Sequence, residues 1–365
     1  MKNIALIGCT GSIGTQVLQT VRRYSEKFSF SALVSGRQRG ELFRLKEEFP
    51  RARVLAAPEL AEGVASRISL FEDCDVALIA AGGFAGLAYT LAAIEAGKTV
   101  ALANKESLVC GGKLVTEAAK RKGVEIVPVD SEHSALFQAL SFRRNAPFER
   151  LVLTASGGPF LHYTKEELAR VTAADALKHP TWNMGAKITV DSATLLNKGF
   201  EIIEAKWLYG ADYSRIGAVV HPESIVHSLV YFADGAAIAQ LGYPDMHVPI
   251  QLALTYPDRL PCAPQLRLEE IGTLRFLRLP EEKFPCFTLA LSAGKAGGTC
   301  PCILNAAGEE AVGAFLKESI TFAQIAETIQ GALNAFAREE VESYEQLFAV
   351  DARVREKVRR EIYGK

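Results

Sequence analysis

The sequence lacks an excess of charge of either sign. Its 365 residues include 41 lysines and arginines against 42 aspartates and glutamates, so the formal net charge is -1. Proteins that bind nucleic acids or membrane surfaces usually carry a basic excess. The balance therefore argues against a nucleic-acid or membrane-surface partner, but it still allows a local basic pocket for a phosphate group.

Cysteine is also scarce and scattered. The 7 cysteines are odd in number and form no C-x-x-C pair. This argues against a disulfide framework and against a structural zinc site, and it predicts a reducing, cytoplasmic compartment. Cys300 and Cys302 are the only close pair, which we interpret as incidental.

A membrane-spanning segment and a leader peptide are likewise not expected. Residues 76–94 carry no charge, but Gly82, Gly83 and Gly86 interrupt the run, which predicts a buried strand, a glycine turn and a helix. An apolar strand follows Met1 at once and leaves no room for a signal or transit peptide.

Strands and helices alternate over the first 150 residues, and the strands are continuously apolar. This pattern predicts a Rossmann-like domain at residues 1–150, with a parallel sheet covered on both faces. The predicted strands are residues 3–7, 28–34, 54–56, 76–80, 99–103 and 125–129.

The rest of the chain predicts an α/β protein with two further parts. Residues 151–256 mix strands with helices, which indicates an α+β catalytic and dimerisation domain with a polar loop at 178–187 and one helix at 193–209. Prolines at 257, 261 and 264 indicate a linker over 257–285. Residues 286–365 predict a helical bundle, with Thr321 and Gln324 as a capping box and Asp351 capping the last helix.

A glycine-rich turn connects the first predicted strand to the first helix. Gly8, Gly11 and Gly14 have the spacing G-x-x-G-x-x-G, a variant of the dinucleotide fingerprint. Glycines let the backbone turn tightly beside a pyrophosphate, which the helix N-terminus attracts. A tight strand-to-helix turn without a ligand would also use glycine.

The residues after the second predicted strand indicate which nucleotide is bound. An NAD site usually has an acidic residue here, whereas this chain has Arg37 and Arg39. Guanidinium groups suit a 2′-phosphate, which favours NADPH. The alternative is that one of these arginines simply lies on a solvated loop.

Charged residues follow two other predicted strands. Lys105 follows one, and Asp130 and Glu132 follow the next; in extended backbone, carboxylates two residues apart point the same way. Such a pair suits Mg²⁺ or Mn²⁺, although a solvated turn is the commoner explanation. Glu201 and Glu204 share one helix face, and the alternative there is an exposed amphipathic helix.

Taken together, these segments resemble the 1-deoxy-D-xylulose 5-phosphate reductoisomerase family. The matching stretches occur in the family's order over essentially the whole chain. They are GCTGSIG, LANKESLV, VPVDSEHSA, TASGGPF, HPTWNMGAKITVDSATLLNKGFEIIEA and HPESIVHS. Departures are mild: Thr181 stands where asparagine is more usual, Leu195 and Leu196 replace a methionine pair, and Gly308 differs slightly.

The resemblance implies an enzyme that converts 1-deoxy-D-xylulose 5-phosphate to 2-C-methyl-D-erythritol 4-phosphate for non-mevalonate isoprenoid synthesis. A metal-assisted skeletal rearrangement would precede hydride transfer from NADPH. The family also implies a homodimer, a phosphorylated ketose as substrate, and Mg²⁺ or Mn²⁺ as the metal, with Co²⁺ as a further option.

The resemblance assigns three sets of residues. The metal would be bound by Asp130, Glu132 and Glu201, which with Lys105 form the catalytic set. The substrate would contact these residues together with Ser131, Ser156, His179, Ser192, Asn197 and Lys198. NADPH would contact Thr10, Gly11, Ser12, Ile13, Gly36, Arg37, Gln38, Asn104, Glu106 and Gly185.

Two other functions explain part of the sequence. A plain NADPH-linked dehydrogenase accounts for the glycine turn but not for three carboxylates with a phosphate clamp, and an NADPH-holding redox sensor accounts for even less. Trp182 and Met184 either close a loop over the ligand or pack normally. His221 and His227 either line the pocket or satisfy core hydrogen bonds, and His133, His162 and His247 are predicted to be structural.

Overall fold

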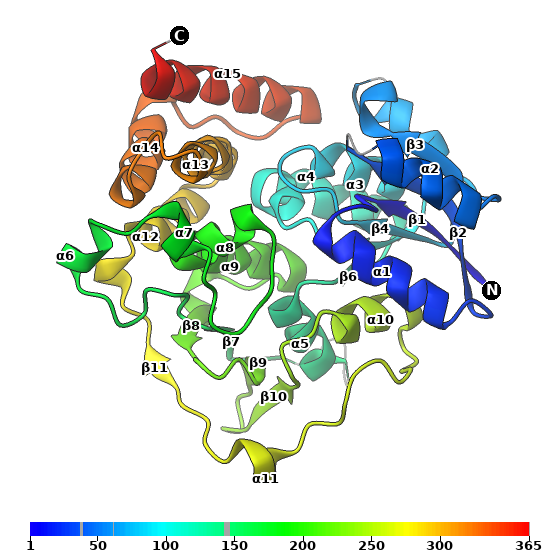
Figure 1. The fold of residues 1–365 in the computed structure, drawn as a ribbon, viewed down its shortest axis with the longest axis horizontal. Helices are drawn as coiled ribbons and strands as arrows, with labels where there is room; N and C mark the ends of the chain where they lie inside the picture. Colours follow the sequence, from blue (N-terminus) through cyan, green and yellow to red (C-terminus); the bar gives the residue numbers. More distant parts are fainter. Residues whose placement is uncertain (37–38, 61, 142–146, 365) are drawn as a thin grey trace. The chain divides into compact units, whose positions relative to one another are not determined.

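The computed structural model describes residues 1–36, 39–60, 62–141 and 147–364. These residues form two compact units (Figure 1). The first unit combines Met1–Phe137 with Asp245–Pro264, and the second combines Gln138–Pro244 with Gln265–Lys365. Residues 245–264 therefore belong to the N-terminal unit, whereas the sequence predicts 245–256 in the central domain and 257–264 in the linker.

The first unit is built on a parallel sheet with the strand order β3-β2-β1-β4-β5-β6. This is the order of a doubly wound nucleotide-binding sheet, and it confirms the predicted fold class. The strands are β1 (Lys2–Ile7), β2 (Phe28–Ser35), β3 (Arg53–Ala56), β4 (Val76–Ile79), β5 (Thr99–Leu102) and β6 (Ile126–Pro128).

Successive residues of a strand point to opposite faces of the sheet. Because residues on both faces are buried, helices cover both faces. Ile4 and Leu6 of β1 belong to one buried apolar cluster with Val17 of the first helix and with Ile250 and Leu254. That packing explains why residues 245–264 return to this unit. The helical segments are α1 (Ser12–Arg23), α2 (Arg39–Glu48), η1 (Ala57–Glu59), η2 (Ala65–Leu70), α3 (Gly86–Glu95), α4 (Glu106–Lys122), α5 (Ser131–Leu140) and α10 (His247–Thr255).

The uncharged run at 76–94 is explained by β4, a glycine turn and the buried α3. Within the described part of the chain, no helix has both the length and the apolar character needed to cross a membrane.

The second unit contains a mixed sheet with the strand order β10-β9-β7-β8-β11. β7 pairs in parallel with β8, and the other neighbours pair antiparallel. The strands are β7 (Arg150–Ala155), β8 (Ile216–Val220), β9 (Val226–Tyr231), β10 (Ala237–Leu241) and β11 (Leu277–Arg278).

Helices make up the rest of the second unit, and those after residue 284 form the predicted C-terminal bundle. They are α6 (Lys165–Leu168), α7 (Ala173–Ala176), α8 (Ala186–Ala193), α9 (Leu196–Tyr209), η3 (Tyr213–Arg215), α11 (Leu268–Ile271), η4 (Glu281–Lys283), α12 (Pro285–Ala296), α13 (Cys300–Leu316), α14 (Phe322–Ala335) and α15 (Tyr344–Tyr363). In Figure 1, α13, α14 and α15 lie side by side.

The predicted helix at 193–209 is confirmed as α9, which begins at Leu196, whereas α8 and the break at Leu195 were not predicted. The prediction for Asp351 is wrong. Asp351 does not cap α15, because Ser343 does so by accepting from the backbone N–H of Gln346. Asp351 lies inside α15 and pairs with Arg355. The capping box of Thr321 and Gln324 on α14 is confirmed.

Arg355 connects α15 to α13. Its guanidinium lies 2.8 Å from a carboxylate oxygen of Glu309, 3.1 Å from one of Glu310 and 2.6 Å from one of Asp351. Burial alone would lower the pKa of Arg355, but these carboxylates hold it well above its ordinary value. The network therefore keeps its positive charge and fixes the last helix.

Candidate active site

The glycine turn of the first unit is fixed by close backbone packing. Gly8 has φ +91°, and a Cβ at this position would lie 2.5 Å from the carbonyl oxygen of Ala80. A Cβ on Gly14 would lie 2.2 Å from the carbonyl oxygen of Gly8. Both positions therefore require glycine. Gly11 is the N-cap of α1 and has no side chain to bond the N–H groups of the first turn, so these groups can face an anion.

The end of β2 lies beside this turn. The Thr10 and Ser35 hydroxyl oxygens are 2.5 Å apart, which joins the turn to β2, and the exposed Gly36 follows. Arg37 and Gln38 lie outside the described residues. The side chain of Arg39 is likewise outside the description, so contact of Arg37 and Arg39 with a 2′-phosphate, the basis for preferring NADPH to NADH, stays a prediction.

Asn104 organises the neighbouring turn. Its amide nitrogen donates to the carbonyl oxygens of Ala81 at 2.7 Å and Gly83 at 3.0 Å, and lies 2.8 Å from a carboxylate oxygen of Glu106. Its amide oxygen accepts from the N–H of Ser107 at 3.0 Å. The side chain is 2% exposed, so it holds the turn after β4 against α4. Its predicted contact with NADPH, like that of Glu106, stays a prediction.

Lys105 and Asp130 form a partly buried ion pair at the carboxyl edge of the parallel sheet. The ammonium of Lys105 lies 3.2 Å from a carboxylate oxygen of Asp130. The other oxygen of Asp130 accepts from the N–H groups of Glu132 at 3.1 Å and His133 at 3.3 Å. Asp130 thus caps α5, and Glu132 lies in the first helical turn.

The premise that Asp130 and Glu132 lie in extended backbone is therefore wrong. Both carboxylates still lie at the sheet edge, because the strand ends at Pro128 and the helix begins at Ser131. The hydroxyl of Ser131 donates to Glu132 at 2.5 Å. This part of the site thus contains Lys105, Asp130, Ser131 and Glu132 together.

In the second unit, four predicted substrate residues flank the break between α8 and α9: Ser192, Asn197, Lys198 and Glu201. Leu195 has φ 57°, is buried, and redirects the chain between Ser192 and Asn197. The hydroxyl of Thr194 donates to the carbonyl oxygens of Val190 and Asp191, both at 3.1 Å, and holds the end of α8. The sequence analysis did not identify this break.

Glu201 is buried on α9 among polar partners. It is 1% exposed, accepts from the Asn197 amide at 2.6 Å, and forms an ion pair with Lys198, which is also buried. Glu204 is 3% exposed. An exposed amphipathic face is therefore excluded for this part of α9. A buried carboxylate is costly unless charge or hydrogen bonds compensate it, so Glu201 is the kind of group that a cation would stabilise.

Ser156 and His179 form a second polar pair in this unit. The His179 Nδ1 atom accepts from the N–H groups of Thr181 at 3.2 Å and Trp182 at 2.9 Å. The proton of the neutral ring is therefore on Nε2, which lies 3.0 Å from the Ser156 hydroxyl. Burial lowers the pKa of His179 to about 4, which favours this neutral form.

The Ser156 hydroxyl consequently accepts two hydrogen bonds, one from His179 and one from the N–H of Gly158 at 3.2 Å. Its own hydrogen then points to another acceptor, as a phosphate-binding serine requires. Gly158 has φ +66°, and a Cβ there would lie 2.9 Å from the carbonyl oxygen of Ser192. The Ser156 turn thus packs directly on α8 beside Ser192.

The loop after His179 is attached to the β8–β9 turn. The Thr181 hydroxyl lies 3.1 Å from that of Ser224, and the Trp182 ring packs edge-on against His227 at 5.9 Å. His221 uses one ring nitrogen for the Arg275 carbonyl at 2.8 Å and the other for the Ile225 N–H at 3.1 Å. His221 is therefore structural, and His227 supports the loop.

These features define a nucleotide-binding α/β fold with an acidic centre and anion-binding donors, and comparisons with known proteins identify the family. The 1-deoxy-D-xylulose 5-phosphate reductoisomerase family model matches residues 4–64 and 56–112. Its C-terminal domain model matches residues 126–209, and the DXP reductoisomerase C-terminal domain model matches residues 241–357.

Relatives with the same name are similar along their whole length. The 1-deoxy-D-xylulose 5-phosphate reductoisomerase of Geobacillus sp. (strain WCH70) is 48% identical, over 98% of this chain and 99% of its own. That of Shouchella clausii (strain KSM-K16) is 47% identical, over 98% of this chain and 100% of its own length.

Solved structures agree. A DOX-P reductoisomerase in complex with NADPH, fosmidomycin and magnesium has a TM-score of 0.91 and 36% identity, over 99% of this chain and 98% of its own. The Zymomonas mobilis enzyme in complex with NADPH has a TM-score of 0.89 and 34% identity, over 100% of both chains. The chain belongs to the 1-deoxy-D-xylulose 5-phosphate reductoisomerase family, which confirms the predicted resemblance.

Proposed function

We propose that this chain converts 1-deoxy-D-xylulose 5-phosphate to 2-C-methyl-D-erythritol 4-phosphate, with NADPH and a divalent metal, in non-mevalonate isoprenoid precursor synthesis. As a member of the family it is an NADPH-dependent oxidoreductase. The observation that carries the proposal is the α8–α9 break, which places the buried Glu201 beside Asn197 and Lys198. A plain dehydrogenase or a redox sensor needs no such arrangement.

The proposed metal ligands are Asp130, Glu132 and Glu201. All three are carboxylates, the donors that Mg²⁺ and Mn²⁺ prefer, and Co²⁺ also accepts them. Asp130 and Glu132 are only partly buried, and Glu201 is compensated by polar neighbours, so the donor set fits a hard cation. When bound, the metal supplies a Lewis acid for the substrate oxygens, and NADPH supplies hydride.

Four residues are proposed to bind the substrate phosphate: Ser156, Ser192, Asn197 and Lys198. The two hydroxyls and the amide donate hydrogen bonds, and the lysine supplies a positive charge. His179 contributes by accepting loop N–H groups and donating to Ser156, which leaves the Ser156 proton for the phosphate. The loop from His179 onward would also exclude water from a reactive aldehyde.

In the first unit, the turn at Thr10, Gly11, Ser12 and Ile13 is proposed to hold the pyrophosphate through backbone N–H groups. Gly36, Arg37, Gln38, Asn104, Glu106 and Gly185 are proposed as further NADPH contacts. Lys105 holds a positive charge 3.2 Å from Asp130. In that position it stabilises negative charge that develops on substrate oxygens near the carboxylates.

The decisive assay follows reduced nicotinamide absorbance after addition of 1-deoxy-D-xylulose 5-phosphate, with and without Mg²⁺ or Mn²⁺. We expect oxidation only when metal is present, with 2-C-methyl-D-erythritol 4-phosphate as product by mass spectrometry. Oxidation that survives chelation would favour a plain dehydrogenase. Tight NADPH binding without turnover of any sugar phosphate would favour the sensor.

We also propose that the enzyme works as a homodimer in the cytoplasm. The seven cysteines are free, in keeping with a reducing compartment. Apolar side chains are exposed on the second unit at Tyr231, Ile238, Phe276 and Leu277, which supports a second copy as partner. Sedimentation should give a dimer for the native chain and a weakened dimer for Ile238→Lys, and a native monomer would contradict this proposal.

A further inference from the structure

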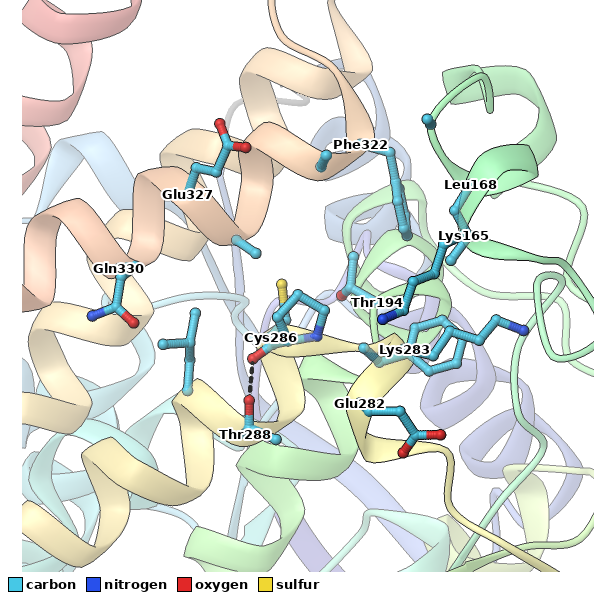
Figure 2. A pocket seen from close by; sticks show the side chains of 16 residues that line it. Lys165, Leu168, Thr194, Glu282, Lys283, Cys286, Thr288, Phe322, Glu327 and Gln330 are labelled. Atoms are coloured by element: carbon cyan, nitrogen blue, oxygen red, sulfur yellow. Dashed lines mark hydrogen bonds between the residues drawn. The ribbon is translucent and has the colours of Figure 1, made fainter.

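A pocket of about 560 Å³ lies entirely within the second unit. Its walls come from α6, the α8–α9 break, η4, α12 and α14 (Figure 2). Among the residues that the structure describes, none of those proposed above to bind substrate, NADPH or metal lines it. Small-molecule sites typically measure roughly 300–1,000 Å³, so this pocket has the size for a ligand of its own.

Most of the pocket wall is apolar. Leu168, Phe284, Phe322 and Ala326 contribute hydrocarbon surface from three separate segments. Burial raises the pKa of the Cys286 thiol to about 12, so this group is neutral and adds to the apolar wall. A ligand would therefore bring an apolar body to this pocket.

Two lysines, Lys165 and Lys283, and two glutamates, Glu282 and Glu327, line the pocket. Figure 2 shows the Lys165 side chain running from α6 toward Thr194, with Glu327 and Glu282 on other sides of the pocket. Among the described residues, Lys165 forms no ion pair. Lys283 donates to the Leu161 carbonyl at 2.8 Å, and burial lowers its pKa although the charge of Glu167 opposes this shift.

We propose that this pocket binds a small amphiphilic anion, that is, an apolar body carrying one acidic head group. The head group pairs with Lys165, and the body packs against Phe284, Phe322 and Ala326. An anion of this kind matches both the apolar wall and the ammonium of Lys165.

Thr194 connects the pocket to the proposed phosphate clamp. It lines the pocket, and its hydroxyl fixes the end of α8 between Ser192 and Asn197. A ligand against Thr194 shifts the break at Leu195 and therefore alters how the clamp holds phosphate. This coupling, unlike the binding itself, rests on the proposed function.

Binding is tested with 8-anilinonaphthalene-1-sulfonate, an apolar fluorophore with one anionic group, and with its neutral analogue N-phenyl-1-naphthylamine. We expect the sulfonate to bind the native chain more tightly than the neutral probe. Lys165→Met should weaken sulfonate binding about tenfold, the size of one charge-assisted hydrogen bond. Lys317→Met, which removes an exposed lysine outside the pocket, should leave it unchanged.

Ala326→Phe fills the pocket and should abolish binding of both probes. If that variant fails to fold, Lys165→Met remains decisive, because Lys165 is exposed and its loss leaves the core intact. Equal sulfonate affinity in the native chain and Lys165→Met would overturn the proposed site.

Coupling is tested by measuring KM for 1-deoxy-D-xylulose 5-phosphate with saturating sulfonate probe. We expect KM to change at least about threefold in the native chain and in Lys317→Met, but not in folded Ala326→Phe. An unchanged KM in the probe-saturated native enzyme would overturn the coupling. Absence of any turnover would instead count against the proposed function, while the binding comparison would still decide the pocket.

Discussion

The glycine turn of the first unit and the α8–α9 break of the second are built from different chemistry. The turn is made by backbone, since Gly8 and Gly14 are fixed by contacts that leave no room for a Cβ. The site beside the break is formed by side chains. Glu201 bonds to Asn197 and pairs with Lys198; Lys198 and Glu201 are buried, and Asn197 is partly buried. A backbone site depends on where side chains are missing, whereas a side-chain site depends on which ones are present.

The comparison predicts that single substitutions act oppositely in the two regions. In the second unit, removing one charge should stop the chemistry and leave the fold intact. In the first unit, adding one methyl group should both destabilise the fold and weaken nucleotide binding. The four predictions below run from the largest expected effect on turnover to the smallest.

Glu201→Gln should lower turnover by at least about a thousandfold, because it removes a proposed metal ligand and with it several kcal/mol of stabilisation. NADPH affinity, measured by nicotinamide fluorescence, should stay within about twofold, because the glycine turn belongs to the other unit. Glu204→Gln is the matched control, since Glu204 is also buried on α9. Equal losses of turnover in both variants would point to helix damage instead.

Gly8→Ala should weaken NADPH binding at least about tenfold and lower the melting temperature. Its Cβ would meet the Ala80 carbonyl at 2.5 Å, and its φ of +91° strains any L side chain, at a cost of about 1–3 kcal/mol. Gly11→Ala provides the comparison, because its Cβ meets nothing nearer than 3.4 Å. It should melt close to the native chain. A native melting temperature for Gly8→Ala would show that the turn is not packed as described.

His179 should make the free energy of unfolding depend on pH. Burial lowers its pKa from 6.5 to about 4, so between these values the unfolded chain binds a proton that the native chain excludes. Above pH 6.5, His179 therefore does not lower the free energy of unfolding. As the pH falls from 6.5 toward 4, it lowers the free energy of unfolding progressively. Urea unfolding across this range should show a smaller pH dependence for His179→Gln.

Two substitutions of His179 distinguish its two roles, which are accepting the loop N–H groups and donating to Ser156. Asparagine at position 179 can still accept the loop N–H groups, whereas glutamine can still donate to Ser156. If orientation of Ser156 is what matters, His179→Gln should keep a lower KM than His179→Asn. The reverse order would assign the main role to the loop contacts.

Arg355→Met should lower the free energy of unfolding by about 3 kcal/mol, because it leaves the partly buried carboxylates of Glu309, Glu310 and Asp351 without their shared cation. The control Lys357→Met breaks an ion pair with Glu361 nearer the surface and should cost under about 1 kcal/mol. NADPH affinity and KM should not change in either folded variant. A change in KM would extend the substrate site to the C-terminal bundle.

The N-terminal sheet could be predicted closely from the sequence, because each parallel strand is a continuous apolar run ended by glycine or polar residues. The α8–α9 break could not. Helix α8 begins after its N-cap Gly185, which provides no side-chain cap, and the break at Leu195 uses a left-handed conformation without a glycine to signal it. Local pattern alone therefore predicts α9 but neither α8 nor the break.

The residues of the candidate site are proposed from the family resemblance, but the local structure that positions them is not predicted from the sequence. The D-x-E pair was read as extended strand, although aspartate before a helical segment is a common N-cap, and this signal was available. The return of residues 245–264 to the first unit depends on packing of Ile250 and Leu254 against the sheet. No local pattern encodes such a long-range contact.

The central proposal is that Asp130, Glu132 and Glu201 bind one metal ion. The most direct test is a Mn²⁺ titration, followed by the loss of the free-ion paramagnetic resonance signal, in the native chain, Glu132→Gln and Glu201→Gln. The account predicts one strong site in the native chain and at least about tenfold weaker binding in each variant. Native Mn²⁺ affinity in folded Glu201→Gln would contradict it, because Glu201 would then not be a metal ligand.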